Sequence, residues 1–157
     1  MSVSEPNDMT DQRIPEGVWQ GFFQSRGRLG RVRYVLFSLT LLLFLVLFAA
    51  LSNVLWSRYY LEYGQMITLA SLVIALMALV INVFHGARRL HDFGASGWWM
   101  LLYLVAPAYP FLLLALVLVP GSSGDNRYGR ASSANSKKVY AMLSIVMALL
   151  LLLLALL

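Results

Sequence analysis

The chain has 157 residues, of which 60% are hydrophobic and 12% are charged, and its formal net charge is +5. A soluble globular domain is nearer to half apolar and a quarter charged, so this composition excludes an ordinary soluble domain. There is no cysteine, which excludes disulfides and thiolate metal sites. The apolar residues stand in long charge-free runs, which indicate an all-α integral membrane protein.

The N-terminal part is polar and then basic. Residues 1–17 are slightly acidic and predict a disordered tail. "VWQGFF" (18–23) places aromatic residues at helical spacing, which is typical of a short interfacial helix. "RGRLGRVRY" (26–34) then sets four arginines directly before the first apolar run: Arg26, Arg28, Arg31 and Arg33. Because Lys and Arg accumulate on the cytoplasmic side, we expect a cytoplasmic N terminus.

Four charge-free apolar runs follow, at residues 34–56, 66–84, 98–119 and 139–157. A helix needs about 20 residues to cross the hydrocarbon core of a bilayer, so each run is long enough. The pattern predicts a bundle of about four hydrophobic helical segments. We assign residues 18–138 to one membrane domain with three of the segments, and residues 139–157 to an additional C-terminal transmembrane helix.

The third run contains a break. "VAPAYPF" (105–111) carries Pro107 and Pro110, and each proline removes a helix hydrogen bond and disfavours helical geometry at the preceding residue. The run is either a kinked full span or a re-entrant segment that returns to the side it entered from. The re-entrant interpretation places 11 of the 12 Lys and Arg residues on one side, whereas a full span divides them almost evenly. Both interpretations remain open from the sequence.

"RRLHDFGASGWW" (88–99) has several features of a helix end. Either Arg88 or Arg89 can pair with Asp92, because both stand at helical spacing from it. Gly94 is suited to end the helix.

The residues after this turn are suited to begin a new segment. Ser96 can cap the next helix, and Trp98 and Trp99 fit the aromatic belt at a membrane interface.

A stripe of small and polar residues along the second run leads to this turn. Its members recur every three or four residues and so share one helical face; they are Thr68, Ser71, Ala75, Ala78, Asn82, His85, Arg89 and Asp92. The stripe predicts close packing against another helix. The alternative is a polar path toward a site formed by Asn82, His85, His91 and Asp92.

A second polar loop, "PGSSGDNRYGR" (120–130), contains Asp125, Asn126 and Arg127. If this loop lies on the same face as residues 88–99, Asp125 can pair with Arg88 or Arg89. Under the same condition, Arg127 can meet Asp92 or a lipid phosphate.

Recognisable catalytic motifs are missing from the sequence. His85 and His91 stand six residues apart and therefore point to different helix faces, so they do not form a metal pair. Nucleophile-elbow and phosphate-loop spacings do not occur. We expect no metal and no cofactor, and nothing indicates nucleic-acid binding.

The stretches "RGRLGRVRY", "RRLHDFGASGWW" and "GDNRYG" occur in this order in the chain. Their order and spacing resemble the domain of unknown function 805 family of small bacterial inner-membrane proteins, over residues 19–129. The resemblance implies a multi-pass protein of the bacterial inner membrane. It implies no activity, because none is established for the family.

We therefore expect a non-enzymatic membrane module whose basic cytoplasmic motifs bind anionic lipid or a protein partner, with a homo-oligomer also possible. The alternative is a membrane-embedded enzyme or small-solute carrier that uses Asn82, His85, His91 and Asp92. The candidate binding residues are Arg26, Arg28, Arg31, Arg33, Arg88, Arg89, His91, Asp92, Trp98, Trp99, Asp125, Asn126 and Arg127.

Overall fold

The computed structural model describes residues 22, 27–132 and 134–156. This part of the chain holds three α-helices, α1 (Arg31–Asp92), α2 (Tyr109–Leu118) and α3 (Lys137–Leu156), and one 3-10 helix, η1 (Gly97–Leu104). The only extended pairing within these residues is an isolated bridge between Asn126 and Gly129. The all-α prediction is confirmed for the described residues, whereas the acidic tail and the expected interfacial helix lie outside them apart from Phe22.

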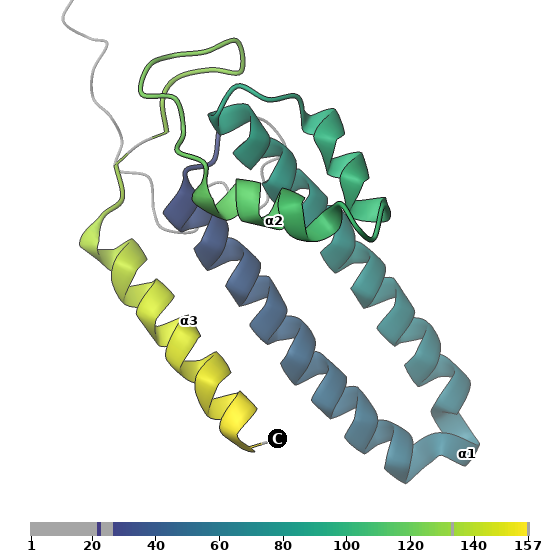
Figure 1. Cartoon of the computed structure of the whole chain (residues 1–157). Coiled ribbons are helices and arrows are strands. Elements are labelled where there is room, and N and C mark those ends of the chain that lie inside the picture. The colour runs from purple at the N-terminus through teal and green to yellow at the C-terminus, as the bar shows by residue number, and fades with distance from the viewer. Residues whose placement is uncertain (1–21, 23–26, 133, 157) are drawn as a thin grey trace, which may run out of the picture.

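Helix α1 is a hairpin of two antiparallel arms rather than a single rod (Figure 1). The backbone leaves helical geometry only at Tyr59, with φ −126° and ψ 20°. Residues 57–65 separate the first two apolar runs and were therefore a candidate loop, but helix continues on both sides of Tyr59. A turn this tight leaves almost no backbone without an intrahelical hydrogen bond, which suits a hairpin tip close to a bilayer.

The arms are long and apolar because they are rich in Leu, Ile, Val and Ala and contain no proline. Helices α1 and α3 both have the length and composition needed to cross a membrane. Side chains along both arms and α3 are exposed and apolar, for example Leu51, Leu69 and Leu154. In a bilayer this surface contacts acyl chains.

The third apolar run is broken where the two prolines predicted a break. It forms η1 and α2, and residues 105–108 between them form a bend and a turn that separate the two helices. Figure 1 shows α2 crossing over the first arm of α1 near the arm's start.

The hydrophobic core lies at the end of the molecule where α1 begins and ends. Buried side chains from every helix meet there: Leu36 and Phe37 from the first arm, Leu90 from the second, Met100 from η1, Leu112 and Leu116 from α2, and Val139 and Val146 from α3. Helix α3 packs along the first arm through residues spaced three or four apart (Figure 1). The packed core therefore holds together the end of the molecule that carries the polar motifs.

Candidate functional site

The second arm of α1 ends in a turn that fixes the position of Asp92. The Gly94 N–H donates to the His91 carbonyl at 3.1 Å, and the Ala95 N–H donates to the Leu90 carbonyl at 2.9 Å. This pair of bonds is the Schellman pattern, and Gly94 adopts the φ of +80° that the pattern requires. The expected helix-ending role of Gly94 is confirmed. Asp92 is consequently held in the last helical position, with its side chain turned into the core.

Asp92 is 1% exposed, and its carboxylate accepts hydrogen bonds from three side chains. Arg28 Nε donates to Oδ1 at 3.2 Å, and the Ser132 hydroxyl donates to the same oxygen at 2.9 Å. Arg89 Nη1 donates to Oδ2 at 2.7 Å. The i, i+3 pairing of Arg89 with Asp92 is thus confirmed. Because both oxygens are occupied by cations or a hydroxyl group, this carboxylate acts as a buried structural acceptor.

Arg28 is surrounded by carbonyl oxygens as well as by the carboxylate. Its two terminal nitrogens donate to the carbonyls of Ser122 at 2.5 Å, Gly124 at 2.7 Å, Gly129 at 3.4 Å and Asp92 at 3.2 Å. A guanidinium group carries five N–H donors in a fixed planar fork, so it can hold a ring of acceptors in this way. Arg28 therefore folds the loop of residues 120–130 around itself.

Arg89 has a comparable role at the C terminus of α2. Its Nε donates to the Leu116 carbonyl at 2.8 Å, and its Nη2 donates to the Val119 carbonyl. Arg31 adds a longer bond of 3.4 Å to the Leu118 carbonyl. The last carbonyls of a helix lack intrahelical partners and carry the negative end of its dipole, so two arginines here stabilise α2.

The loop of residues 120–130 is tied to the end of α1 by further bonds. The Ser122 N–H donates to the Asp92 carbonyl at 2.8 Å, and Asn126 Nδ2 donates to the His91 carbonyl at 2.9 Å. Arg127 Nη2 donates to the Gly94 carbonyl at 3.3 Å. Residues 88–96 and 120–130 consequently share one end of the molecule.

An aromatic stack covers the outer side of this junction. The rings of His91 and Tyr128 are parallel within 8°, with 3.9 Å between their centroids. The Arg127 guanidinium carbon lies 4.7 Å from the centre of the Tyr128 ring. His91 thus serves as a stacking surface here, and the stack joins the second motif to the third.

Gly121 lies where no side chain fits. A Cβ atom at this position would overlap the Asp92 carboxylate. The loop backbone therefore passes directly over Asp92 and closes it off from solvent.

The expected contacts of Asp125 and Arg127 differ from those in the structure. Asp125 is exposed and accepts from the Ala131 N–H at 3.0 Å rather than pairing with Arg88 or Arg89. Arg127 contacts Gly94 and Tyr128 rather than Asp92. Arg28, which precedes the first arm by only a few residues, binds Asp92 in place of Arg127. The other predicted partner of Arg127, a lipid phosphate, stays a prediction.

The polar residues proposed for a catalytic or transport path have separate surroundings. His85 is fully buried, with its Nε2 2.7 Å from the Phe22 carbonyl and its ring packed against the rings of Phe22 and Phe37. Asn82 is half-buried. His91 stacks on Tyr128, and Asp92 binds its two arginines. These side chains do not converge on a common cavity, and the described residues hold no group of three His, Asp or Glu able to bind a metal.

Burial divides the remaining candidates into two groups. Arg28, Arg88 and Arg89 are buried, and Arg33 is half-buried. Arg31, Arg127, Trp98 and Trp99 are exposed, Trp98 to 78%, whereas Arg26 lies outside the described residues. Ser96 accepts from the Trp98 N–H at 3.4 Å, so its predicted capping role is confirmed.

The sequence alone did not identify three members of the cluster: Ser122, Ser132 and the carbonyls at the end of α2. Serines in a polar loop carry no distinguishing pattern. The end of α2 does offer a signal in retrospect, because a short helix that stops two residues before Pro120 and has only apolar side chains near its C terminus must have its last carbonyls satisfied from elsewhere.

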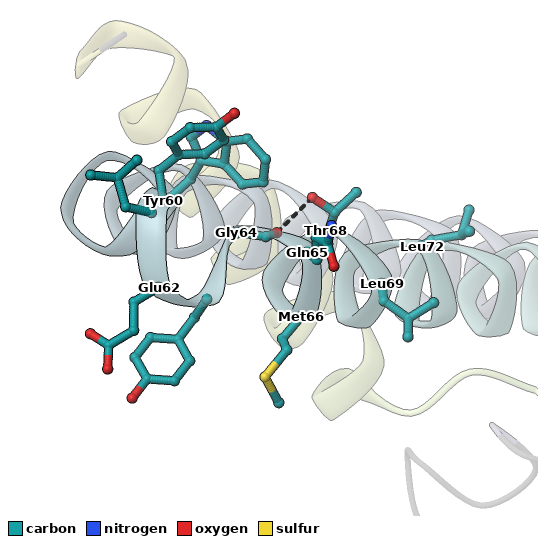
Figure 2. Close-up of a pocket in the computed structure, with 11 residues that line it drawn as sticks. Tyr60, Glu62, Gly64, Gln65, Met66, Thr68, Leu69 and Leu72 are labelled. Atoms are coloured by element: carbon teal, nitrogen blue, oxygen red, sulfur yellow. Dashed lines mark hydrogen bonds between the residues drawn. The ribbon is translucent and has the colours of Figure 1, made fainter.

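A hollow of about 780 Å³ lies at the opposite end of the molecule, at the tip of the α1 hairpin. Figure 2 shows Tyr60 and Glu62 pointing to different sides of the helix around Gly64, whose carbonyl accepts from Thr68. A second hollow of about 610 Å³ runs between the arms beside Ser52 and Ser71. Neither hollow is lined by the arginine and Asp92 cluster.

Comparison with known proteins gives consistent results. The family model "Protein of unknown function (DUF805)" matches residues 22–130. Inner membrane protein YhaH of Escherichia coli (strain K12) is 31% identical over 117 residues, which cover 71% of this chain and 89% of that protein. Inner membrane protein YhaI of the same organism is 35% identical over 105 residues, which cover 66% of this chain and 80% of that protein.

No solved structure matches the chain. The matched range begins at Phe22 and ends at Arg130, and so contains Arg28, Arg89 and Asp92 together with the hairpin, η1 and α2, whereas Ser132 lies just beyond it. The resemblance inferred from the three motifs is confirmed, and this chain belongs to the DUF805 family, whose relatives named here are inner membrane proteins.

Proposed function

We propose that this inner-membrane protein is a non-enzymatic module that holds anionic phospholipid headgroups around the end where the three motifs meet, and that this end faces the cytoplasm. The observation that carries the proposal is a rim of five exposed basic side chains at that end. Its members are Arg31, Arg127, Arg130, Lys137 and Lys138, and we call them the basic rim.

The members of the basic rim come from separate segments that lie close together. Arg31 begins α1, and the two lysines begin α3, which packs against the first arm. A Cβ atom at Gly30 would lie 3.2 Å from the Ser132 hydroxyl, which places the start of α1 beside the segment that leads into α3. Arg127 contacts Gly94 at the end of α1. These contacts support a rim at the end of the hairpin, which the proposal places at the depth of lipid headgroups.

The charge balance favours this orientation. Among the described residues, the acidic side chains are Glu62, Asp92 and Asp125, and Asp92 is buried and paired. The hairpin tip carries Arg58 and Glu62, which balance each other. An excess of Lys and Arg on one side is typical of the cytoplasmic face.

Burial separates the arginines that hold the fold from those that can meet lipid. The side chains of Arg28 and Arg89 are engaged in internal hydrogen bonds, whereas those of Arg130, Lys137 and Lys138 have none within the described part of the chain. Each exposed basic group near an anionic membrane surface contributes on the order of 1 kcal/mol. Three such groups are therefore sufficient to enrich anionic lipid by at least about tenfold.

The test compares the retained lipids of the full-length chain and two variants. Each protein is placed in nanodiscs of equal phosphatidylglycerol and phosphatidylethanolamine, and the lipids that stay bound are counted by native mass spectrometry. The triple variant R130Q/K137Q/K138Q should lose most of the preference for phosphatidylglycerol. R58Q, which removes a charge at the hairpin tip, should retain it.

High salt should weaken the preference of the unmodified chain, because exposed charges are screened. An equal preference in the triple variant and the unmodified chain would overturn the proposal. A phosphatidylglycerol preference that R58Q lowers as much as the triple variant does would also overturn it, because the rim would then have no special role.

A further inference from the structure

The pair η1 and α2 is too short to cross a bilayer and yet is covered with apolar side chains. A 3-10 helix rises about 2.0 Å per residue, so the eight residues of η1 extend about 16 Å. An α-helix rises about 1.5 Å per residue, so the ten residues of α2 extend about 15 Å. The hydrocarbon core is about 30 Å thick, so each element has the depth of one leaflet.

The chain leaves and returns at the same end of the molecule. Residue 97 follows directly on the Gly94 turn, and Ser122 is hydrogen-bonded to the Asp92 carbonyl. Arg89 binds the Leu116 and Val119 carbonyls and so fixes the C terminus of α2 at that end. The two polar loops that flank the pair are thereby in direct contact, and two loops in contact cannot lie on opposite sides of a bilayer.

One face of the pair is packed and the other is open. Met100, Leu112 and Leu116 are buried in the core. On the outer face, Leu104 is 81% exposed and Phe111 is 73% exposed. Neither η1 nor α2 carries a charged side chain. This outer face continues the exposed apolar surface of the arms, which lipid covers in an inner-membrane protein.

Most of the backbone N–H groups in the bend between the two elements are either paired or absent. The Val105 N–H donates to Leu102 at 3.0 Å, and the N–H groups of Ala108 and Tyr109 both donate to Val105, at 2.9 and 3.1 Å. Pro107 and Pro110 have no N–H to satisfy. Backbone donors exposed to hydrocarbon cost several kcal/mol each, so a bend with three paired N–H groups and two prolines exposes few of them at membrane depth.

We propose that η1 and α2 form a re-entrant hairpin whose outer face contacts the acyl chains of one leaflet only, the leaflet beside the Asp92 cluster. Trp98 and Trp99 mark its entry at the headgroup level, and residues 105–108 are its deepest part. The chain then crosses the membrane three times, through the two arms of α1 and through α3. This inference is independent of whether the basic rim selects anionic lipid.

The absence of cysteine allows a direct test by single-cysteine variants of the full-length chain. S96C, S123C, A106C and S57C all replace small side chains that are exposed or half-buried. In sealed vesicles of oriented protein, S96C and S123C should react with a membrane-impermeant maleimide from one side, and S57C only from the other. S57C is the matched control, because it reports the opposite face in the same fold.

The depth of the bend is measured with a spin label on A106C. Its collision rate with oxygen should be high, and its collision rate with a water-soluble nickel chelate should fall to the level found for lipid-facing positions. Labelling of S96C and S123C from opposite sides would overturn the proposal in favour of a full span. Nickel access at A106C equal to that at S123C would overturn it in favour of a hairpin outside the hydrocarbon.

Discussion

Arg28 and Asp92 are 64 positions apart in the chain and are joined twice, once through the carboxylate and once through the backbone carbonyl, each at 3.2 Å. Arg28 stands before the first arm of α1, and Asp92 is the last residue of the second arm. Their contact therefore closes the open end of the hairpin, and the carbonyls that Arg28 also binds bring residues 120–130 to the same point.

Removal of the Asp92 charge should be strongly destabilising. D92N leaves Arg28 and Arg89 buried without a counter-ion, and loss of one partner of a buried ion pair costs about 3–5 kcal/mol. The measurement is the free energy of unfolding in mixed detergent micelles. D125N is the control, because Asp125 is exposed, and it should change stability by less than about 0.5 kcal/mol. Equal effects of the two substitutions would contradict the assigned role of Asp92.

A charge-conserving change at Arg89 should show that geometry matters beyond charge. R89K keeps the cation, but a single ammonium group cannot reach Asp92, Leu116 and Val119 together. We expect a loss of about 2 kcal/mol or more, since hydrogen bonds to charged groups contribute about 1.5–3 kcal/mol. Amide hydrogen exchange in residues 109–118 should accelerate as well. The control R130K changes an exposed arginine and should leave both readouts as they are in the unmodified chain.

Two glycines in the same loop offer a matched pair. G121A introduces a methyl group that overlaps the Asp92 carboxylate, whereas a Cβ at Gly124 meets nothing within 4 Å. Overpacking typically costs about 1–3 kcal/mol, so G121A should lower the midpoint of thermal unfolding measurably. G124A should leave it nearly unchanged. A larger effect from G124A than from G121A would show that the loop does not pass over Asp92 as described.

The stack of Tyr128 on His91 should depend on the ring and not on the hydroxyl group. Y128F retains the ring and should be close to neutral. Y128L removes the aromatic face, and aromatic pairs are worth about 0.5–1.5 kcal/mol beyond the area they bury. Proteolysis of the loop at residues 120–130 is the sensitive measurement, and Y128L should be cut faster than Y128F. Indistinguishable cleavage rates would mean that the stack does not hold the loop.

The sequence was informative where a local rule decides the structure. Uninterrupted apolar runs predict the arms and α3, because a bilayer leaves the backbone no alternative to helix. Pro107 and Pro110 predict the break in the third run, and Gly94 predicts the end of α1, because each acts through its own backbone. Helical spacing allowed Asp92 to pair with either Arg88 or Arg89, and in the structure its partner is Arg89.

The partners of Arg28 could not be read from the sequence in the same way. The sequence offers several arginines as partners for the Asp92 carboxylate. Only the three-dimensional path of the chain decides which of them contacts it. The continuation of helix through residues 57–65 was also not predicted, because a break confined to Tyr59 has no signature in composition or periodicity. Long-range contacts and tight turns between helices are thus the features that only the three-dimensional structure revealed.

The hydrogen bonds around Asp92 also have a consequence for the order of events during synthesis of the chain. Arg28 and Asp92 are available once the hairpin has been synthesised, but Gly129 lies 101 positions after Arg28 and Ser132 lies 40 positions after Asp92. The cluster cannot close until residue 132 has left the ribosome. Until then Asp92 lacks the hydrogen bond that the Ser132 hydroxyl donates to its carboxylate. Completion of the cluster therefore has to wait for a segment that is synthesised after both arms of the hairpin.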